Sequence, residues 1–313
     1  MPPIELAPDR TTTGPVPVPM SYTHKTNPAE VLLVSWCRTG ADTFTITARW
    51  PREHTFYLAR HGRYDPLFLT ETVRQTLPML SHAAYDVPFG HQLLWKDFAW
   101  DIDPDELWDD GRDAHVELHI TCSDVKYRKG RATALTLAVE ATRAGRRLAT
   151  ARTRFTIQDR AVYERLRGQY ADIASANARV LPLPPPSPTH ETGRTRFQDV
   201  VLSCTDVPLR WQLRTDTSHP VLFDHPVDHA PGMLLLEAAR QAAQAAAQPR
   251  QTLVTAMSCD FTRYAELDAP CWITARALPD DPNGRRWMLV TAQQNGEEIF
   301  TSVVALAEVP TEL

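Results

Sequence analysis

Residues 231–241 read Pro-Gly-Met-Leu-Leu-Leu-Glu-Ala-Ala-Arg-Gln, and residues 65–75 read Asp-Pro-Leu-Phe-Leu-Thr-Glu-Thr-Val-Arg-Gln. Both segments place a glutamate three residues before an arginine, and they are offset by 166 residues. Apolar residues surround both charged pairs, which predicts helices at about 67–84 and 233–247 that are buried on all sides. Pro78 predicts a kink in the first helix or its early end. The repeat therefore predicts two copies of one unit, each built around a buried helix.

Strand patterns follow the first helix. Apolar side chains at Leu135, Leu137 and Val139 alternate with polar ones, which indicates a half-buried strand. An Ala144-Gly145 turn comes next, and a return strand reaches Phe155. The first half thus ends in a predicted antiparallel hairpin.

The second helix is followed by the same kind of pattern. Residues 271–278 and 286–293 read as strands, and Asn295-Gly296 is a strong hairpin signal. The turn glycines of the two halves are 151 residues apart instead of 166, so the first half carries about 15 extra residues. We place them in the acidic loop 101–113. The predicted class is α+β, with two curved antiparallel sheets, each wrapped around a long central helix.

Proline outnumbers glycine by 26 to 12 in this chain of 313 residues, and much of it is concentrated in two places. Six prolines fall in the first 19 residues and five in residues 181–188. Such stretches favour extended arms and semi-rigid spacers. They predict an arm, a first domain, a linker and a second domain, at residues 1–20, 21–160, 161–195 and 196–313.

Composition excludes several classes of protein. A net charge of −5 gives no electrostatic reason to expect nucleic acid. No apolar run approaches the length of a membrane span, and the N-terminus does not read as a signal peptide. Five scattered cysteines without a CxxC argue against zinc and disulfides, which predicts a reduced, cytoplasmic protein. No GxGxxG or metal-ligand pattern occurs, so no cofactor and no metal are predicted.

Each buried helix carries a charged pair, Glu71 with Arg74 and Glu237 with Arg240. Residues three apart share a helix face, and a buried charge is costly unless it is paired. Two interpretations stay open at this point. The pairs are either ion pairs at the interface between the halves, or carboxylates and guanidinium groups that face a cleft.

Other candidate side chains lie in the loops and strands around the helices. His54 and His219 precede the two helices, and either bind substrate or cap the preceding loop. His229 comes two residues before the Pro-Gly turn and is either an acid/base group or structural. Arg263 and Tyr264 face either an acyl tunnel or a carrier protein, or lie at a solvated strand end.

Several motifs in order resemble the A-factor biosynthesis (AfsA/ScbA-type) proteins of actinomycetes. They are Tyr64-Asp-Pro-Leu67, Glu71-Thr-x-Arg-Gln75, Asp216-Thr-Ser-His-Pro220, Asp228-His-x-Pro-Gly-Met-Leu-Leu-Leu-Glu-Ala-Ala-Arg-Gln241 and Phe261-x-Arg-Tyr-Ala-Glu266. The resemblance implies a tandem hot-dog fold that forms its own pseudo-dimer. Hot-dog dehydratases resemble the segment 219–243 as well, but His225 lies six residues before Pro231, where they place their histidine about eight before.

The family resemblance also implies an activity. A β-ketoacyl group would move from acyl carrier protein to the hydroxyl of dihydroxyacetone phosphate, in biosynthesis of a γ-butyrolactone or furan-type signal that controls antibiotic production. A hot-dog thioesterase or dehydratase and a non-catalytic hormone-binding module are the alternatives. Pairing of two chains into a homodimer is left open.

Acyl transfer needs a base for the attacking hydroxyl, donors for the oxyanion and a cation for the phosphate. Glu237 is the predicted base, provided that burial raises its pKa toward neutrality. Arg240 would grip the phosphate or orient Glu237, and Glu71 with Arg74 would do the same in a second tunnel or support the fold. The remaining predicted site residues are His229 for proton transfer and, for substrate binding, Arg263, Tyr264, His54, His219 and Gln241.

Overall fold

The computed structural model describes residues 14–279, 281 and 285–309, so residues 1–13 of the predicted arm lie outside it. Among the described residues, thirteen strands form one antiparallel sheet in the order β1-β2-β3-β5-β6-β7-β4-β10-β13-β12-β11-β9-β8. The two halves of the chain meet where β4 pairs with β10, with Trp100 opposite Met257. Read outward from this junction, the strand order of the first half is β4, β7, β6, β5, β3, β2, and that of the second half is β10, β13, β12, β11, β9, β8. The two orders match position by position, which is the predicted duplication.

The first half contains seven of these strands and the helix α1. Its strands and helix are β1 Val16–Pro17, β2 Leu33–Arg38, β3 Thr43–Trp50, α1 Leu67–Tyr85, β4 Gln92–Ile102, β5 Ala114–Arg128, β6 Arg131–Arg143 and β7 Arg146–Gln158. Short 3-10 turns lie at Met20–Thr23, Pro28–Glu30 and Pro104–Leu107.

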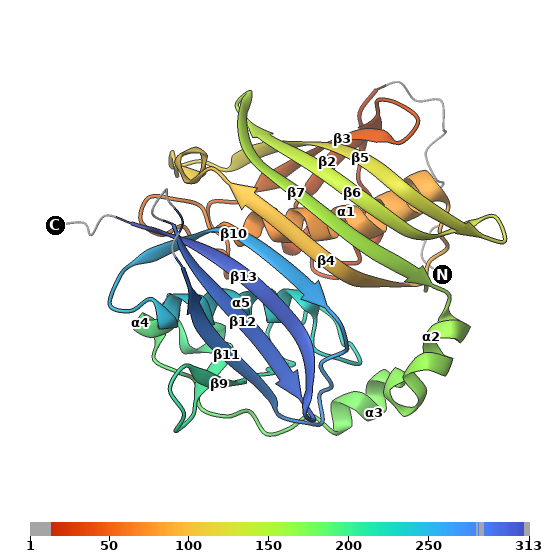
Figure 1. The fold of residues 1–313 in the computed structure, drawn as a ribbon. Coiled ribbons are helices and arrows are strands. Elements are labelled where there is room, and N and C mark those ends of the chain that lie inside the picture. Colours follow the sequence, from red (N-terminus) through yellow and green to blue (C-terminus); the bar gives the residue numbers. More distant parts are fainter. Residues whose placement is uncertain (1–13, 280, 282–284, 310–313) are drawn as a thin grey trace.

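The second half repeats this plan around the helix α5. Its elements are β8 Leu202–Cys204, β9 Arg210–Leu213, α5 Gly232–Ala246, β10 Thr252–Phe261, β11 Cys271–Leu278, β12 Arg286–Gln294 and β13 Glu297–Glu308. Between the halves lie α2 Arg160–Arg167, a 3-10 turn Gly168–Ala171, α3 Ile173–Ala178, α4 Thr189–Thr192 and a 3-10 turn Phe197–Asp199. Figure 1 shows α1 and α5 on the same face of the sheet, each behind the strands of its own half.

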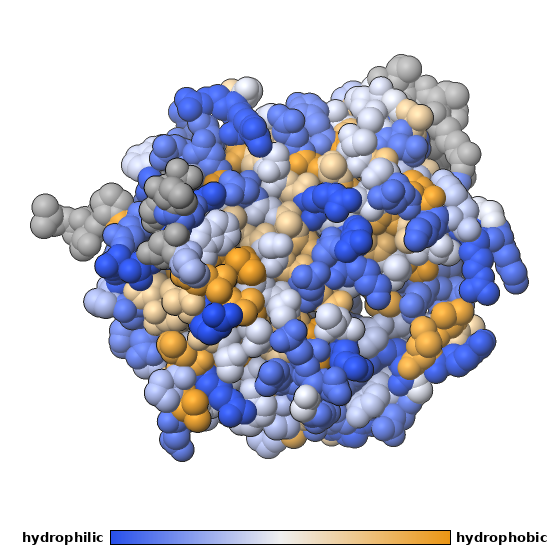
Figure 2. Space-filling model, viewed as in Figure 1, coloured by the Kyte–Doolittle hydropathy of each residue, from blue (hydrophilic) through white to orange (hydrophobic). Residues whose placement is uncertain are grey.

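Both long helices are buried, as their apolar sequences predict. The helix α1 continues through Pro78, which is itself buried, so the expected early end is wrong. Packing on all sides outweighs the roughly 3 kcal/mol that an interior proline costs. The opposite face of the sheet is mostly hydrophilic, with scattered apolar groups (Figure 2). This division agrees with the alternation of buried and exposed residues along β5.

The two predicted hairpin turns are present. Ala144 and Gly145 have φ of 49° and 76°, and Asn295 and Gly296 have φ of 54° and 81°, which is the geometry that an Asn-Gly turn favours. The expected position of the extra residues, however, is wrong. The loop 103–113 is only two residues longer than its counterpart 262–270. The larger differences lie in the regular elements, since α1 has 19 residues and α5 has 15. The strands β5 and β6 have 15 and 13 residues, whereas their counterparts β11 and β12 have 8 and 9.

The segment 161–195 connects the halves and contributes to the core. Its helices α2 and α3 lie at one edge of the molecule (Figure 1), and its proline-rich part runs along the second half, where the Ser187 amide donates to the Leu202 carbonyl. The division of the chain at 160 and 195 stays a prediction. Among the described residues, no helix is long and apolar enough to span a membrane.

Candidate active site between the two halves

A buried ion cluster lies at the glutamate of α1. The ammonium of Lys25 lies 3.0 Å from Glu71 Oε1, and Arg74 donates to the same carboxylate through Nε and Nη2 at 3.1 and 3.0 Å. The Gln75 amide donates to Glu71 Oε1 at 2.8 Å. The carboxylate is therefore held by two cations and one amide, which the ion-pair interpretation predicts.

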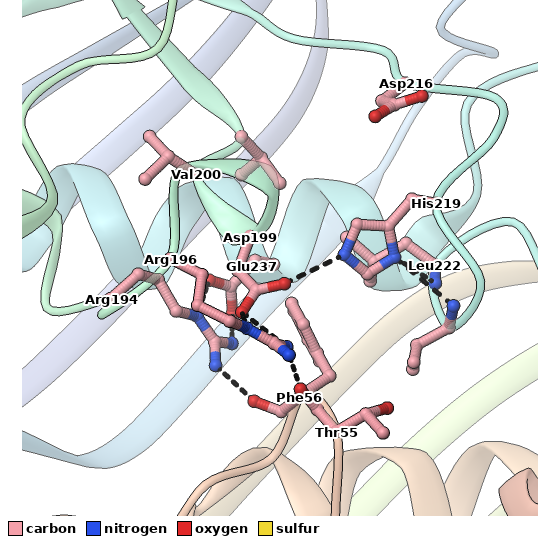
Figure 3. A network of polar contacts seen from close by, with 12 residues as sticks. Thr55, Phe56, Arg194, Arg196, Asp199, Val200, Asp216, His219, Leu222 and Glu237 are labelled. Atoms are coloured by element: carbon pink, nitrogen blue, oxygen red, sulfur yellow. Dashed lines mark hydrogen bonds and ion pairs between the residues drawn. The ribbon is translucent and has the colours of Figure 1, made fainter.

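The helix α5 carries the same cluster around Glu237. Arg194 donates to both carboxylate oxygens at 2.8 and 2.7 Å, and Arg240 does so at 2.9 and 2.6 Å. Gln241 donates to Glu237 Oε1, as Gln75 does to Glu71. Figure 3 shows Arg194 against Glu237, with a further hydrogen bond from Arg194 to the carbonyl oxygen of Phe56 in the other half.

The pKa values of the two carboxyl groups are shifted in the direction opposite to that predicted. Burial alone would raise the pKa, but Arg194 and Arg240 outweigh it and lower the pKa of Glu237 to about 2. Arg74 and Lys25 lower the pKa of Glu71 to about 2 in the same way. The expected rise in the pKa of Glu237, on which its predicted role as a base depended, is therefore wrong, because two arginine side chains surround this carboxylate.

His54 and His219 are buried beside the two clusters. Nδ1 of His54 accepts the amides of Phe56 and Tyr57, and Nδ1 of His219 accepts those of Val221 and Leu222. Their Nε2 atoms face Glu30 at 3.3 Å and Asp199 at 3.4 Å (Figure 3). Both histidines thus fix the loop before a helix, and they line neither of the two cavities described next.

A cavity of about 390 Å³ lies between the halves. Five predicted site residues line it, two from α1 and three from the second half: Glu71, Arg74, His229, Arg263 and Tyr264. A second cavity of about 280 Å³ is lined by Arg240, while Glu237 and Gln241 line neither. The exposed fraction of Glu237 is 0%. We call these cavities the first and the second cavity.

His229 forms a dyad with Asp228 on the wall of the first cavity. Its Nδ1 lies 2.6 Å from Asp228 Oδ1, and Asp228 also accepts the Tyr163 hydroxyl at 2.7 Å and Arg167 Nε at 3.2 Å. Burial would raise the pKa of Asp228, but these neighbours lower it to about 2. Because the ionised carboxylate can only accept, Nδ1 of His229 carries a proton, and in the neutral imidazole Nε2 is the acceptor nitrogen.

Tyr264 and Arg263 extend the wall from the dyad to the surface. The Tyr264 ring meets the His229 ring edge to face, with centroids 4.8 Å apart, and the Arg167 guanidinium lies 3.9 Å from its centroid. Burial raises the pKa of Tyr264 to about 12, so its hydroxyl stays protonated and can donate. Arg263 pairs with Glu297 at 3.3 Å, and its side chain is 60% exposed.

His24 is a further cavity residue that the sequence analysis missed. Its Nε2 lies 2.8 Å from Nε2 of His82, whose Nδ1 donates to the Val87 carbonyl at 2.6 Å. His82 therefore accepts at Nε2, His24 donates there, and Nδ1 of His24 is left unprotonated. Burial and the neighbouring His82 lower the pKa of His24 to about 3. Its φ of 55° is unusual for a residue other than glycine.

A second repeat in the sequence could have found this residue and the missed cations. Residues 24–32 read His-Lys-Thr-Asn-Pro-Ala-Glu-Val-Leu, and residues 193–201 read Gly-Arg-Thr-Arg-Phe-Gln-Asp-Val-Val. The two segments align at an offset of 169 residues. This repeat contains Lys25, Glu30, Arg194 and Asp199, which complete the two clusters. Asp228, which the sequence analysis did not predict as a site residue, directly precedes His229 in the chain.

A long helix wrapped by a curved antiparallel sheet, present twice with a cavity between the copies, defines a tandem hot-dog protein. Two solved thioesterase structures share this fold. The 12:0-ACP thioesterase from Umbellularia californica gives a TM-score of 0.55 at 8% identity, covering 84% of this chain and 94% of that one. A putative oleoyl thioesterase from Lactobacillus plantarum gives 0.54 at 13% identity, covering 87% and 99%.

Sequence comparison identifies the family within this fold. The A-factor biosynthesis hotdog domain model matches residues 6–159 and 177–307, and the chain belongs to this family. A 2-oxo-3-(phosphooxy)propyl 3-oxoalkanoate synthase of Streptomyces virginiae is 44% identical over 287 residues, which cover 92% of this chain and 96% of the relative. One of Streptomyces coelicolor is 41% identical over 293 residues, which cover 93% and 91%. The predicted fold and family are confirmed.

Proposed function

We propose that this chain is an acyltransferase that joins a 3-oxoacyl group from a thioester to the hydroxyl of dihydroxyacetone phosphate. The product is the phosphorylated ester for which its relatives are named, and it would serve the synthesis of a γ-butyrolactone or furan-type signal. The observation that carries the proposal is the first cavity, which combines several cationic side chains with the Asp228–His229 dyad.

The cationic lining of the first cavity suits a phosphorylated acceptor. Its charged residues are Lys25, Arg74, Lys96 and Arg263 against Glu71 and Asp224, a net charge of +2. Arg74 uses Nε and Nη2 for Glu71, and its Nη1 makes no hydrogen bond to any residue that the structure describes. We assign the phosphate to Arg74 and Lys25, because charge-assisted bonds to phosphate are strong.

Proton transfer is assigned to His229. The hydroxyl oxygen of the acceptor attacks the thioester carbonyl carbon, and its proton passes to Nε2 of His229. Asp228 stabilises the resulting imidazolium, whereas His24 has only the neutral His82 beside it and stays an acceptor. Tyr264 would donate to the oxyanion. When the carbon–sulfur bond breaks, the thiolate leaves and takes the proton from His229.

The acyl donor is proposed to arrive on acyl carrier protein at the exposed end of the cavity wall. Arg263 lies there, paired among the described residues with the exposed Glu297, and can exchange this partner for an anionic group of the carrier. Homodimer formation and a cytoplasmic location stay predictions.

The proposed function is tested by mixing the purified protein with a 3-oxoacyl carrier-protein thioester and dihydroxyacetone phosphate. Mass spectrometry should detect the phosphorylated ester and the free carrier thiol in equal amounts. Free 3-oxo acid without the ester would identify a thioesterase and overturn the proposal. Binding of a finished hormone without any turnover would identify a binding module and overturn it as well.

A further inference from the structure

The second cavity is the structural counterpart of the first one and carries a stronger positive charge. Its charged lining consists of four arginines and one aspartate, a net charge of +3: Arg60, Arg63, Arg240, Arg250 and Asp65. Three of these arginines have carboxylate partners, namely Asp105 for Arg63, Glu237 for Arg240 and Glu308 for Arg250. Arg60 has none within ion-pair distance in the part of the chain that the structure describes.

The guanidinium of Arg60 lies near two other arginine side chains, those of Arg240 and Arg194. It donates to the Gly193 carbonyl. Burial together with the nearby charges of Arg240 and Arg194 lowers its pKa and outweighs the opposing effect of Asp65. A half-buried guanidinium that faces two others gains free energy when an anion joins it. The wall of the second cavity is therefore organised for a negatively charged ligand.

The two histidines assigned to the first cavity, His24 and His229, are replaced by other residues at the equivalent positions here. The prolines before the two helices, Pro66 and Pro231, align at an offset of 165, which places Tyr64 at the position of His229. The Tyr64 hydroxyl donates to the Arg112 carbonyl, so it is already engaged.

Gly193 stands at the position of His24. A Cβ there would lie 2.5 Å from Gln244 Oε1, which Arg240 Nη1 holds at 3.0 Å. The polar side chain of Gln244 thus fills the space in which the histidine would lie. The second cavity keeps its cations and has no histidine at the positions of His24 and His229. Two other histidines, His61 and His190, line it, and the side chain of His190 is 78% exposed and lies 3.9 Å from Glu191.

We propose that the second cavity binds a small phosphate monoester without converting it. A volume of about 280 Å³ suits a ligand of triose phosphate size, and Arg60 is its principal contact. Inorganic phosphate shares this chemistry, so the experiment must separate the two ligands. The proposal concerns a site other than that of the proposed transfer reaction.

The test is isothermal titration of dihydroxyacetone phosphate into the full chain with no acyl donor present. We expect two equivalents bound to the wild type and one equivalent fewer for Arg60→Gln, with Arg60→Lys retaining the site. Arg160→Gln, at an exposed helix position, is the matched control and should bind like the wild type. Equal binding by the wild type and Arg60→Gln overturns the proposal.

Inorganic phosphate, titrated separately, should bind the same site at least tenfold more weakly, and equal affinity would overturn the assignment to a monoester.

The titration contains no acyl donor, so its outcome does not depend on the proposed transferase activity. A wild type that binds one equivalent, lost in Arg60→Gln, would support the second site while contradicting the acceptor site of the first cavity. A His229→Gln variant should keep both equivalents and lose turnover. Turnover that persists in His229→Gln and is lost in Arg60→Gln would place the reaction in the second cavity, and would overturn the non-converting role.

Discussion

Replacing Glu237 by glutamine tests whether the repeated glutamate supports the fold or performs chemistry. Glutamine keeps the shape of the side chain but removes the charge between Arg194 and Arg240. The pKa of Glu237 lies at about 2, against an ordinary value of 4.5, and one unit is worth about 1.4 kcal/mol. The ionised carboxylate therefore contributes about 3 kcal/mol to the free energy of unfolding at neutral pH, close to the ~3–5 kcal/mol that breaking a buried pair costs.

Urea unfolding followed by tryptophan fluorescence measures this loss directly. We expect Glu237→Gln to lower the free energy of unfolding by about 3 kcal/mol, while the turnover of the folded protein at low temperature stays within a few-fold of the wild type. The matched variant is Glu71→Gln, which removes the same kind of charge from the first cavity. It should lose comparable stability and also turnover, because Glu71 orients Arg74 and Lys25.

One result would refute this reasoning. If Glu237→Gln unfolds like the wild type and yet loses turnover by about a hundredfold or more, the carboxylate takes part in the reaction. The ion cluster would then not be the main reason for its presence. Loss of both stability and turnover in the two variants alike would also contradict the assignment of the reaction to the first cavity.

Three further outcomes are expected. His229→Gln should lower turnover by about 10²–10⁴ with an unchanged unfolding curve, and an unaffected rate would exclude the dyad from the reaction. Since the folded-state pKa values of Glu71 and Glu237 are lowered, their stabilisation is complete above about pH 5 and is lost as the pH falls toward 2. Urea titrations at stepped pH should show this decline, and a flat profile would contradict it. Gly232→Ala places a Cβ 2.7 Å from a ring carbon of Trp95 on the wall of the first cavity. This overlap should lower the free energy of unfolding by about 1–3 kcal/mol, measured by thermal unfolding, and should lower turnover. Wild-type behaviour would show that Trp95 moves freely.

The fold could be predicted from local patterns because those patterns carry their own physical causes. Two helices that are apolar almost all round must be buried, and an Asn-Gly pair adopts the positive φ values that a tight hairpin needs. The 15 extra residues were misplaced for an equally physical reason. Longer β5 and β6 strands and a longer α1 continue the regular pattern of their neighbours, so the sequence shows no break at the insertions.

The site could be predicted only in part, because its electrostatics depend on residues far apart in the chain. Arg194 lies 43 positions before Glu237, in the segment expected to act as a linker, and it reverses the direction in which burial shifts the pKa of that glutamate. The role of His24 likewise depends on His82, 58 positions away. No spacing within one helix reveals such a partner, whereas the Asp228–His229 dyad, local in sequence, was within reach.

In a duplicated chain, a residue present in both halves is better evidence for folding than for catalysis. Both halves must bury a helix, and Gln75 and Gln241 make the same contacts for that purpose, each binding one glutamate and one backbone segment. Chemistry needs only one cavity, so its residues are free to differ between the halves. His24 and Gly193 differ, as do His229 and Tyr64, and all four line a cavity. The repeated glutamates therefore support the fold and hold the cations of each half, and we propose that the differing positions on the cavity walls carry the proton transfer.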